Sequence, residues 1–367
     1  MGFDANSRLV TDKADLGRTI QQTRPEPGAL REGEVDLALD LFSLTTNNIT
    51  YAAFGDSIGY WTVFPTGEDG TGHMPVWGFA DVVASRAEGI EVGARVFGYF
   101  PMADVLRVEA GKVSRGGFAD LSPWRTGVPD IYNRYVLCAG DANYQKALEP
   151  AEAIFRPLFV TSYTAAEFLR DNGFFGAKQV VVSSASSKTA YGAAWSMKDD
   201  GLTLMGVTGK RNKAFVEGLG AYQTVVDYDA IDQLPTGAPT VYLDLSGDPG
   251  LRAKVHAHFG DDLVYDCLVG ATQTDGFTID AGLPGPKPTF FFAATTLDAH
   301  RERGTLRAFY ERFFADQAAF FEQVVEPSNP WIRIIEGDGL EAAAKVTRDL
   351  ADGRSDPAEG HVIRVKR

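Results

Sequence analysis

The sequence predicts an α/β protein with two domains, one rich in β-strands and one built on a parallel sheet. The chain has 367 residues, whereas a typical domain has about 100–200 residues. Short apolar runs broken by Gly and Pro fill residues 35–99, but strand-like and helix-like segments alternate from about Phe155 onwards. A strand–helix–strand pattern after Pro330 can return to the first domain.

The first part of the chain reads as strands and turns. Residues 35–43 alternate between apolar and polar side chains, as a half-buried strand does. Residues 76–85 and 89–98 predict two more strands, with glycines at the turn positions. Residues 55–74 are rich in Gly, Pro and aromatic side chains, which predicts a long loop beside a site.

The second part alternates strands with helices, which is typical of a doubly wound parallel sheet covered on both faces. Strands are expected at residues 180–184, 203–208, 224–228, 240–246, 263–269 and 289–293. Helices are expected at residues 189–197, 213–219, 249–259 and 301–325, the last ended by Pro327 and Pro330.

The tail predicts a strand at residues 331–335, a helix at 340–352 and a last strand at 361–366. One domain is therefore expected to combine residues 1–154 and 328–367, with residues 155–327 inserted as the other.

Composition narrows the class of protein. With 35 basic and 49 acidic side chains, the net charge of -14 opposes nucleic acids and anionic membranes as partners. The start of the chain has no signal-peptide pattern, and no segment has the ~20 consecutive apolar residues of a membrane span, so we expect a cytoplasmic protein. Cys138 and Cys267 lie in apolar contexts and are expected to be reduced. The five histidines show no metal-ligand spacing, and no metal site is predicted.

An anion site is predicted where the strand that runs to Ser184 ends and a helix begins after a short loop. The first-turn amides of a helix have no partner within the helix, and the helix dipole adds positive charge there. Ser186, Ser187, Lys188 and Thr189 supply hydroxyl groups and an ammonium at this junction. We expect these residues to hold phosphate groups.

Four segments make the chain similar to the medium-chain dehydrogenase/reductase superfamily, in particular its zinc-free, quinone-oxidoreductase-like branch. These segments are residues 44–51, 75–83, 93–98 and 340–365. Within the superfamily, the sequence at residues 46–51, 75–80, 156–162 and 183–189 resembles that of an uncharacterised bacterial family of unknown function. The resemblance implies a GroES-like β domain, an inserted Rossmann domain, a nicotinamide cofactor and a homodimer.

The chain departs from this superfamily in two places. Its zinc members carry Gly-His-Glu where this chain has Gly78, Phe79 and Ala80, so alcohol-dehydrogenase zinc chemistry is not expected. The nucleotide loop lacks the usual glycines, and Gly192 is the first glycine after it. A member of the superfamily that has lost its nucleotide remains an alternative.

The choice of nicotinamide depends on the residues after the second strand of the Rossmann domain. An acidic residue there accepts a hydrogen bond from the ribose hydroxyl of NAD, whereas basic residues bind the 2′-phosphate of NADP. Here the strand runs into Thr208, Lys210 and Arg211 without an acid, which predicts NADPH. The alternative is that Lys210 and Arg211 are solvated charges at the start of a helix.

Without a metal, a hydrogen-bond donor must stabilise the oxyanion that forms during reduction. Tyr51 and Asn48 lie in the segment that faces the nicotinamide in the resembling family, and we predict them as catalytic donors. A hydrogen-bonded turn is the alternative. An apolar substrate pocket is predicted from four aromatic residues, for which ordinary core packing is the alternative: Tyr60, Trp61, Trp77 and Phe79.

These observations favour an NADPH-dependent, zinc-independent oxidoreductase. It would transfer hydride to an activated C=C or C=O group of a small apolar substrate such as an enone or a quinone. Two other classes stay open. One is a non-catalytic nucleotide or ligand binder on the same fold, and the other is a lyase or hydrolase that acts on a phosphate-bearing substrate such as a coenzyme A ester.

Overall fold

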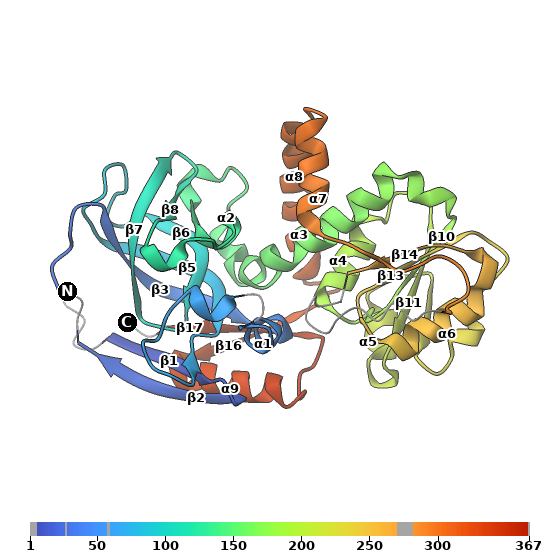
Figure 1. Ribbon diagram of the computed structural model, residues 1–367, viewed down its shortest axis with the longest axis horizontal. Helices are drawn as coiled ribbons and strands as arrows, with labels where there is room; N and C mark the ends of the chain where they lie inside the picture. Colours follow the sequence, from blue (N-terminus) through green and yellow to red (C-terminus); the bar gives the residue numbers. More distant parts are fainter. Residues whose placement is uncertain (1–5, 26–27, 57–58, 270–281, 366–367) are drawn as a thin grey trace. The chain divides into compact units, whose positions relative to one another are not determined.

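The computed structural model describes residues 6–25, 28–56, 59–269 and 282–365 (Figure 1). The chain forms two compact units. The first combines Met1–Ile154 with Ile332–Arg367, and the second is Phe155–Trp331. Among the described residues, no helix is long and apolar enough to cross a membrane.

The first unit contains a sheet that closes on itself. Its strand order is β16-β17-β3-β5-β6-β9-β8-β7, and β3 pairs with β7 as well as with β5. The closed strands are β3 (Glu34–Leu44), β5 (Pro75–Ser85), β6 (Arg95–Pro101), β7 (Val105–Ser114), β8 (Gly117–Asp120) and β9 (Arg134–Leu137). A smaller sheet holds β1 (Asn6–Asp12), β2 (Asp15–Arg24) and β4 (Thr71–Gly72). This closed sheet is the predicted GroES-like part of the fold.

The C-terminal tail returns to this unit as a βαβ element. β16 (Arg333–Asp338) and β17 (Glu359–Arg364) are parallel, and α9 (Gly339–Ala351) connects them. β17 pairs with the second half of β3, whereas β7 pairs with the first half. Gly360 lies between Ile154 and Ile332, because a Cβ atom added to it would come within 2.5 Å of Ile154 Cδ1 and 2.3 Å of Ile332 Cδ1.

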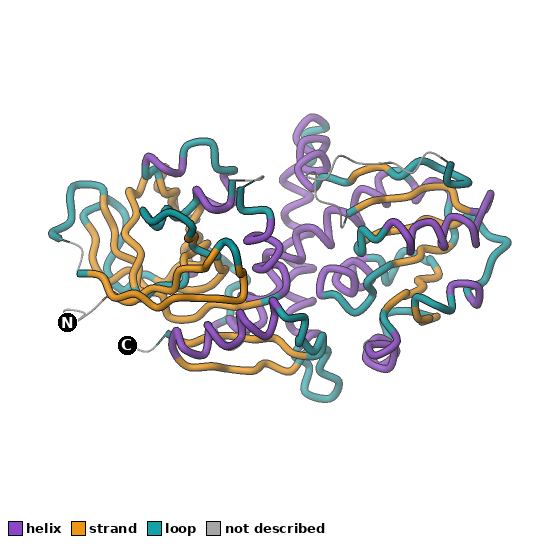
Figure 2. The backbone as a smooth tube through the Cα atoms, turned by 60° about the horizontal axis from the view of Figure 1, so that its bottom comes forward, coloured by secondary structure: helices purple, strands orange, loops and turns teal. Residues whose placement is uncertain are grey.

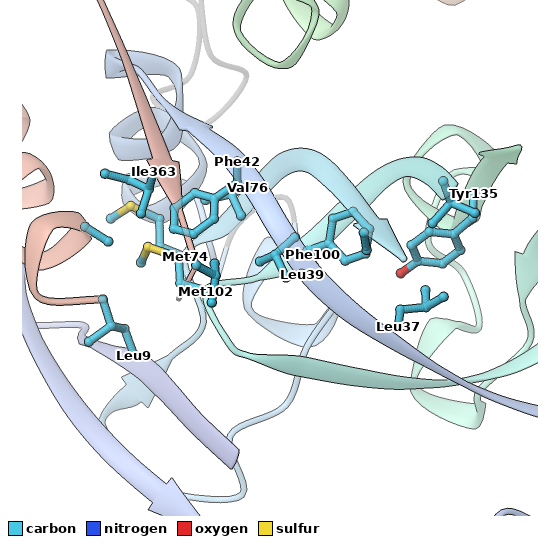
Figure 3. Close-up of a cluster of buried hydrophobic side chains, with 14 of the residues drawn as sticks. Leu9, Leu37, Leu39, Phe42, Met74, Val76, Phe100, Met102, Tyr135 and Ile363 are labelled. Atoms are coloured by element: carbon cyan, nitrogen blue, oxygen red, sulfur yellow. The ribbon is translucent and has the colours of Figure 1, made fainter. Parts of the chain in front are cut away.

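The core of the first unit is apolar and continuous. Alternate residues of β3, such as Leu37 and Leu39, point into it with Met74, Val76 and Phe100 (Figure 3). Two helices of this unit, α1 (Thr46–Ala53) and α2 (Asp130–Asn133), carry residues of the candidate site.

The second unit is a doubly wound parallel sheet with helices packed against it (Figure 2). Its strands are β10 (Gln179–Val182), β11 (Thr203–Thr208), β12 (Thr224–Asp227), β13 (Thr240–Asp244), β14 (Leu263–Leu268) and β15 (Thr289–Phe290). The order β12-β11-β10-β13-β14-β15 is the Rossmann order 3-2-1-4-5-6. Its helices include α3 (Glu149–Asp171), which begins in the first unit, α4 (Lys188–Ser196), α5 (Lys213–Gly218) and α6 (Pro249–Phe259). The predicted fold class is confirmed.

Two elements differ from the sequence-based expectation. The helix predicted over residues 301–325 is wrong, because the structure has α7 (Ala293–Glu302) and α8 (Leu306–Val324) in its place. Gly304 separates them with a φ of 68°, a backbone conformation that continues no right-handed helix. Trp331 was predicted to begin a strand, but it packs against Tyr191 and Phe320 of the second unit.

Candidate functional site

The predicted nucleotide loop joins β10 to α4. Ser187 is the N-cap of α4, and its hydroxyl accepts a hydrogen bond of 3.2 Å from the Ala190 amide. Ser184 makes the turn that a glycine usually makes, with a φ of 48°, and its carbonyl accepts from the Ser187 amide at 2.7 Å. Lys188 and Thr189 occupy the first turn of α4. The loop therefore presents a helix N-terminus without a glycine motif.

Ser186 meets the end of the neighbouring strand. Its Oγ atom accepts hydrogen bonds from Thr208 Oγ1 and Asn212 Nδ2, each at 3.1 Å. Because both bonds use lone pairs of Ser186, its own hydroxyl hydrogen remains as a donor. The structure thus brings together Ser186 and Thr208, which the sequence placed in the same site from separate segments. Asn212 was not predicted.

Lys210 and Arg211 follow Thr208 in a short 3-10 helix, and both are exposed. Tyr228, just beyond β12, was also missed by sequence reasoning. Its hydroxyl lies 3.5 Å from Ser184 Oγ. This edge of the sheet therefore carries hydroxyl, amide and cationic groups that follow three adjacent strands.

Gly206 in β11 explains how a loop without glycines fits. A Cβ atom added to Gly206 would lie 3.1 Å from the Ala185 Cβ and 3.1 Å from the Tyr222 ring. The space that a loop glycine usually leaves is therefore provided by a glycine in the neighbouring strand, with a small alanine in the loop.

A buried carboxylate fixes the base of this loop. Asp244, at the end of β13, accepts from Ser183 Oγ at 2.9 Å and from Arg252 Nη2 at 2.8 Å. Ser183 Oγ in turn accepts from the amides of Leu245 and Ser246. The loops after β10 and β13 are thereby tied together in the fully buried interior. No sequence signal had pointed to this network.

The second group of candidate residues is an aromatic cluster in the first unit. Tyr51 comes from α1, Tyr60 from a 3-10 helix at Tyr60–Thr62, Trp77 from β5, Tyr99 from β6 and Tyr132 from α2. Ring centroids are 4.7 Å apart for Tyr51 and Tyr60, 4.8 Å for Trp77 and Tyr99, and 4.9 Å for Tyr99 and Tyr132. The residues thus form one contiguous group.

Hydroxyl groups converge in this cluster. Tyr60 Oη and Tyr132 Oη lie 3.0 Å apart, and Trp77 Nε1 donates to Tyr51 Oη at 3.4 Å. Tyr99 Oη is buried and has no hydrogen-bond partner within the described part of the chain. A buried hydroxyl without a partner is costly.

Burial moves the pKa of these phenols further above neutral pH. It raises the pKa of Tyr51 to about 12, and it also raises the pKa of Tyr60, Tyr99 and Tyr132 above the ordinary tyrosine value. At neutral pH all four are therefore hydrogen-bond donors rather than phenolates.

A buried ion pair holds the segment that carries Tyr132. Arg125 Nε donates to Asp120 Oδ2 at 2.9 Å, and both side chains are 1% exposed. Arg125 Nη1 also donates to the Tyr132 carbonyl at 3.2 Å. Its guanidinium carbon lies 4.3 Å from the centroid of the Phe64 ring. The orientation of Tyr132 thus depends on this pair.

Asn48, one of the two predicted catalytic donors, has other contacts in the structure. Asn48 closes a capping box, accepting from the Thr45 amide at 2.7 Å, and its Nδ2 atom donates to the Pro75 carbonyl at 2.8 Å. The Oδ1 and Nδ2 atoms of Asn48 are therefore both used in hydrogen bonds that stabilise the fold. Tyr51, by contrast, stays in the cluster with Tyr60 and Trp77.

Trp61 and Phe79 belong to the packed interior. The Trp61 indole fills the space over Gly55 and Gly72, where an added Cβ atom would lie 2.1 and 2.2 Å from it. Phe79 is fully buried and packs against Phe97, with their ring centroids 5.2 Å apart. These two side chains pack in the interior, and a role for them in lining a substrate pocket stays a prediction. Tyr99 and Tyr132 were not predicted, because single tyrosines in apolar segments carry no distinguishing pattern.

Comparisons with known proteins identify the fold. No curated protein matches the sequence. CurA from Vibrio vulnificus, solved in complex with NADPH, is 15% identical with a TM-score of 0.62, and the match covers 98% of this chain and 99% of that one. The yhdH oxidoreductase from Salmonella enterica, in complex with NADP, is 17% identical with a TM-score of 0.56, covering 98% and 100%.

The quinone oxidoreductase from Coxiella burnetii is 14% identical with a TM-score of 0.54, covering 99% of this chain and 100% of that one. At such identities the likeness shows a common two-domain fold. The model of a family described as a protein of unknown function, DUF2855, matches residues 42–356, which is most of the chain, and this protein therefore belongs to that family.

Proposed function

We propose that this protein is an NADPH-dependent oxidoreductase that reduces an activated C=C or C=O group of a small apolar substrate without zinc. The observation that carries the proposal is the contiguous cluster of four neutral phenols, two buried and two half-buried, in which the Tyr99 hydroxyl has no partner among the described residues. Enones and quinones have an oxygen that accepts hydrogen bonds and a body that packs against aromatic rings.

The second unit has residues that fit the cofactor. The first-turn amides of α4, with Ser186, Ser187, Lys188 and Thr189, would hold the pyrophosphate. Thr208, Lys210 and Arg211 would hold the 2′-phosphate, supported by Asn212 through Ser186. Two similar structures, CurA and the yhdH oxidoreductase, are described in complex with NADPH and NADP.

The residues of the cluster would have separate roles in the reduction of the substrate. Bound NADPH supplies the hydride. Tyr51, a neutral phenol whose pKa burial raises to about 12, would donate a hydrogen bond to the substrate oxygen as negative charge develops there. The proton that completes the reduction would come from water through the half-buried Tyr60–Tyr132 hydroxyl pair.

The cofactor assignment is tested by thermal unfolding with NADPH and with NADH. A ligand that binds the native state raises its apparent stability. We expect stabilisation by NADPH and loss of that effect in Lys210→Ala combined with Arg211→Ala. A matched control, Lys198→Ala with Arg307→Ala, removes one exposed lysine and one exposed arginine elsewhere in the same unit. Equal loss in the control would contradict the assignment.

Activity separates the remaining classes. An oxidoreductase consumes NADPH, followed by absorbance, when quinones or enones are added. A non-catalytic binder shows the thermal shift without turnover. Stabilisation by coenzyme A esters together with indifference to NADPH would favour a lyase or hydrolase and would overturn the proposal.

We also propose that the protein is a homodimer. Among the described residues, β15 is the outer strand of the parallel sheet, and the Phe292 side chain beyond it is 61% exposed. The outer strand of a sheet is a place where a second copy can add its own strand. Sedimentation of the wild type and of Phe292→Ser tests this, and a monomeric wild type would refute it.

A further inference from the structure

A histidine and two carboxylates converge between α3 and α7, outside the residues assigned to the cofactor. Glu167 and Asp171 lie four residues apart on α3, and His300 lies near the end of α7. His300 Nε2 is 3.5 Å from Glu167 Oε1 and 3.7 Å from Asp171 Oδ2. The three ligand atoms all lie within 4.8 Å of one another.

The other ring nitrogen of His300 contacts Thr305. Nδ1 lies 2.8 Å from Thr305 Oγ1, and Thr305 Oγ1 lies 3.4 Å from the His300 carbonyl, to which it can donate. When the hydroxyl donates to that carbonyl, Oγ1 accepts from Nδ1, which then carries the hydrogen. In this neutral tautomer Nε2 has a lone pair.

That lone pair faces two carboxylates. His300 is 4% exposed, and its Nε2 atom makes no hydrogen bond within the described ranges of the chain. In that tautomer the Nε2 lone pair is directed at the oxygens of the buried Glu167 and the partly exposed Asp171, which is repulsive. Three arginines bonded to these carboxylates reduce the repulsion. A proton on Nε2, or a metal ion between the nitrogen and the oxygens, would remove it.

The distances distinguish these two cations. A protonated imidazole would approach a carboxylate to about 2.7–2.9 Å, as charge-assisted hydrogen bonds do. Zinc-type bonds of about 2.0–2.1 Å in tetrahedral geometry instead separate the ligand atoms by about 3.3–3.4 Å. The observed 3.5 and 3.7 Å are closer to the metal geometry.

We propose that Glu167, Asp171 and His300 bind a divalent transition-metal ion, Zn²⁺ being the natural occupant, with water as the fourth ligand. One nitrogen and two oxygens make a donor set that zinc accepts. The Nδ1 contact of His300 with Thr305 supplies the outer hydrogen bond that metal-binding histidines usually make.

Three arginines surround the carboxylates and can remain in place. Arg170 Nη1 donates to Glu167 Oε2 at 2.6 Å, Arg312 Nη2 donates to Glu167 Oε1 at 2.6 Å, and Arg303 Nη2 donates to Asp171 Oδ2. Each carboxylate oxygen has a second lone pair for a metal. The side chains of Arg303 and Arg312 are 46% and 52% exposed, so water screens their charge.

The ion would be structural rather than catalytic. It would link α3 to α7, whose ligands lie far apart in the sequence, and so stabilise the second unit when bound. This proposal does not rest on the oxidoreductase function. Hydride transfer without zinc and a structural zinc are compatible.

Thermal unfolding of tag-free full-length protein, stripped with a chelator and then given ZnCl₂, tests the proposal. We expect Zn²⁺ to raise the Tm by several degrees in the wild type and not in His300→Gln. The control His258→Gln removes a histidine of α6 whose Nε2 atom donates to the Leu234 carbonyl at 2.9 Å, and it should keep the response.

If His300→Gln does not fold, Asp171→Asn replaces it, because Asp171 is partly exposed. Visible absorption of bound Co²⁺ in the wild type, lost in either variant, would support the site independently. An unchanged wild-type Tm with Zn²⁺ would overturn the proposal. An equal response of the Tm to Zn²⁺ in His300→Gln would also overturn the proposal. So would a result in which His300→Gln differs from the wild type only in how its Tm changes with pH.

Discussion

Neutralising Asp120 is expected to destabilise the first unit strongly. Asp120→Asn removes the charge that faces Arg125, and both side chains are 1% exposed. Removing one partner of a buried ion pair costs about 3–5 kcal/mol, because the other charge stays buried without compensation. Arg125 keeps its bonds to the Tyr132 carbonyl and the Tyr135 hydroxyl, so we expect the lower end, about 3 kcal/mol.

Urea unfolding followed by circular dichroism measures this loss, with the midpoint shifted and the slope unchanged. The matched control is Asp56→Asn. Asp56 lies 3.5 Å from the Lys13 ammonium and its side chain is 84% exposed, so its loss is expected to cost about 0–1 kcal/mol. A loss for Asp120→Asn no larger than that of the control would refute the buried pair as the anchor of the Tyr132 segment.

Three further changes test the site and the packing around it. Tyr51→Phe is expected to lower kcat for NADPH-dependent reduction by about 10²–10³-fold while leaving stabilisation by NADPH unchanged, because one oxyanion donor is lost. Gly72→Ala is expected to cost about 1–3 kcal/mol in urea unfolding, since the new methyl group would lie 2.2 Å from the Trp61 indole. Burial and the neighbouring Arg8 lower the pKa of His73 from 6.5 to about 4. Because the unfolded chain then binds the proton more readily, stability should fall by up to about 3 kcal/mol as the pH drops from 6.5 towards 4, measured by urea unfolding at each pH.

Each of these changes has its own control. Tyr310→Phe alters a tyrosine that is 37% exposed and should keep the wild-type kcat. Gly218→Ala adds a methyl group to α5 with nothing within 4 Å, and is expected to stabilise by about 0.5–1 kcal/mol. His73→Gln should flatten the pH dependence. Wild-type kcat in Tyr51→Phe, or an unchanged slope in His73→Gln, would contradict the respective argument.

Much of the fold was predictable because local sequence patterns indicate its strands and helices. The alternation of strands and helices in residues 179–268 predicts the Rossmann order, since parallel strands need helical crossovers. The break at Gly304 was missed because an apolar helical period continues on both sides of it. Only the backbone conformation of that glycine separates α7 from α8.

The site was less predictable, because its residues meet only through the pairing of strands. Ser186 follows β10 and Thr208 ends the adjacent β11, and strand order alone brings them together. Tyr99 and Tyr132 join Tyr51 through the pairing and curvature of β5, β6 and β9, which no local pattern encodes. The same reasoning explains Asn48, whose capping bonds satisfy the start of a short helix that the sequence had indicated only as a turn.

The pairing of β17 with β3 has a consequence for the order in which the chain folds. β3 can pair with β17 only when residues near 360 have been synthesised. The second half of β3 therefore has no β17 partner while the ribosome synthesises the whole second unit. The second unit can complete its own sheet first, and the two first-unit residues that flank it in the chain, Ile154 and Ile332, both lie against Gly360 in the folded protein. A folded insertion of this kind shortens the loop that the last strand must close. Folding of the first unit is therefore expected to depend on prior folding of the second.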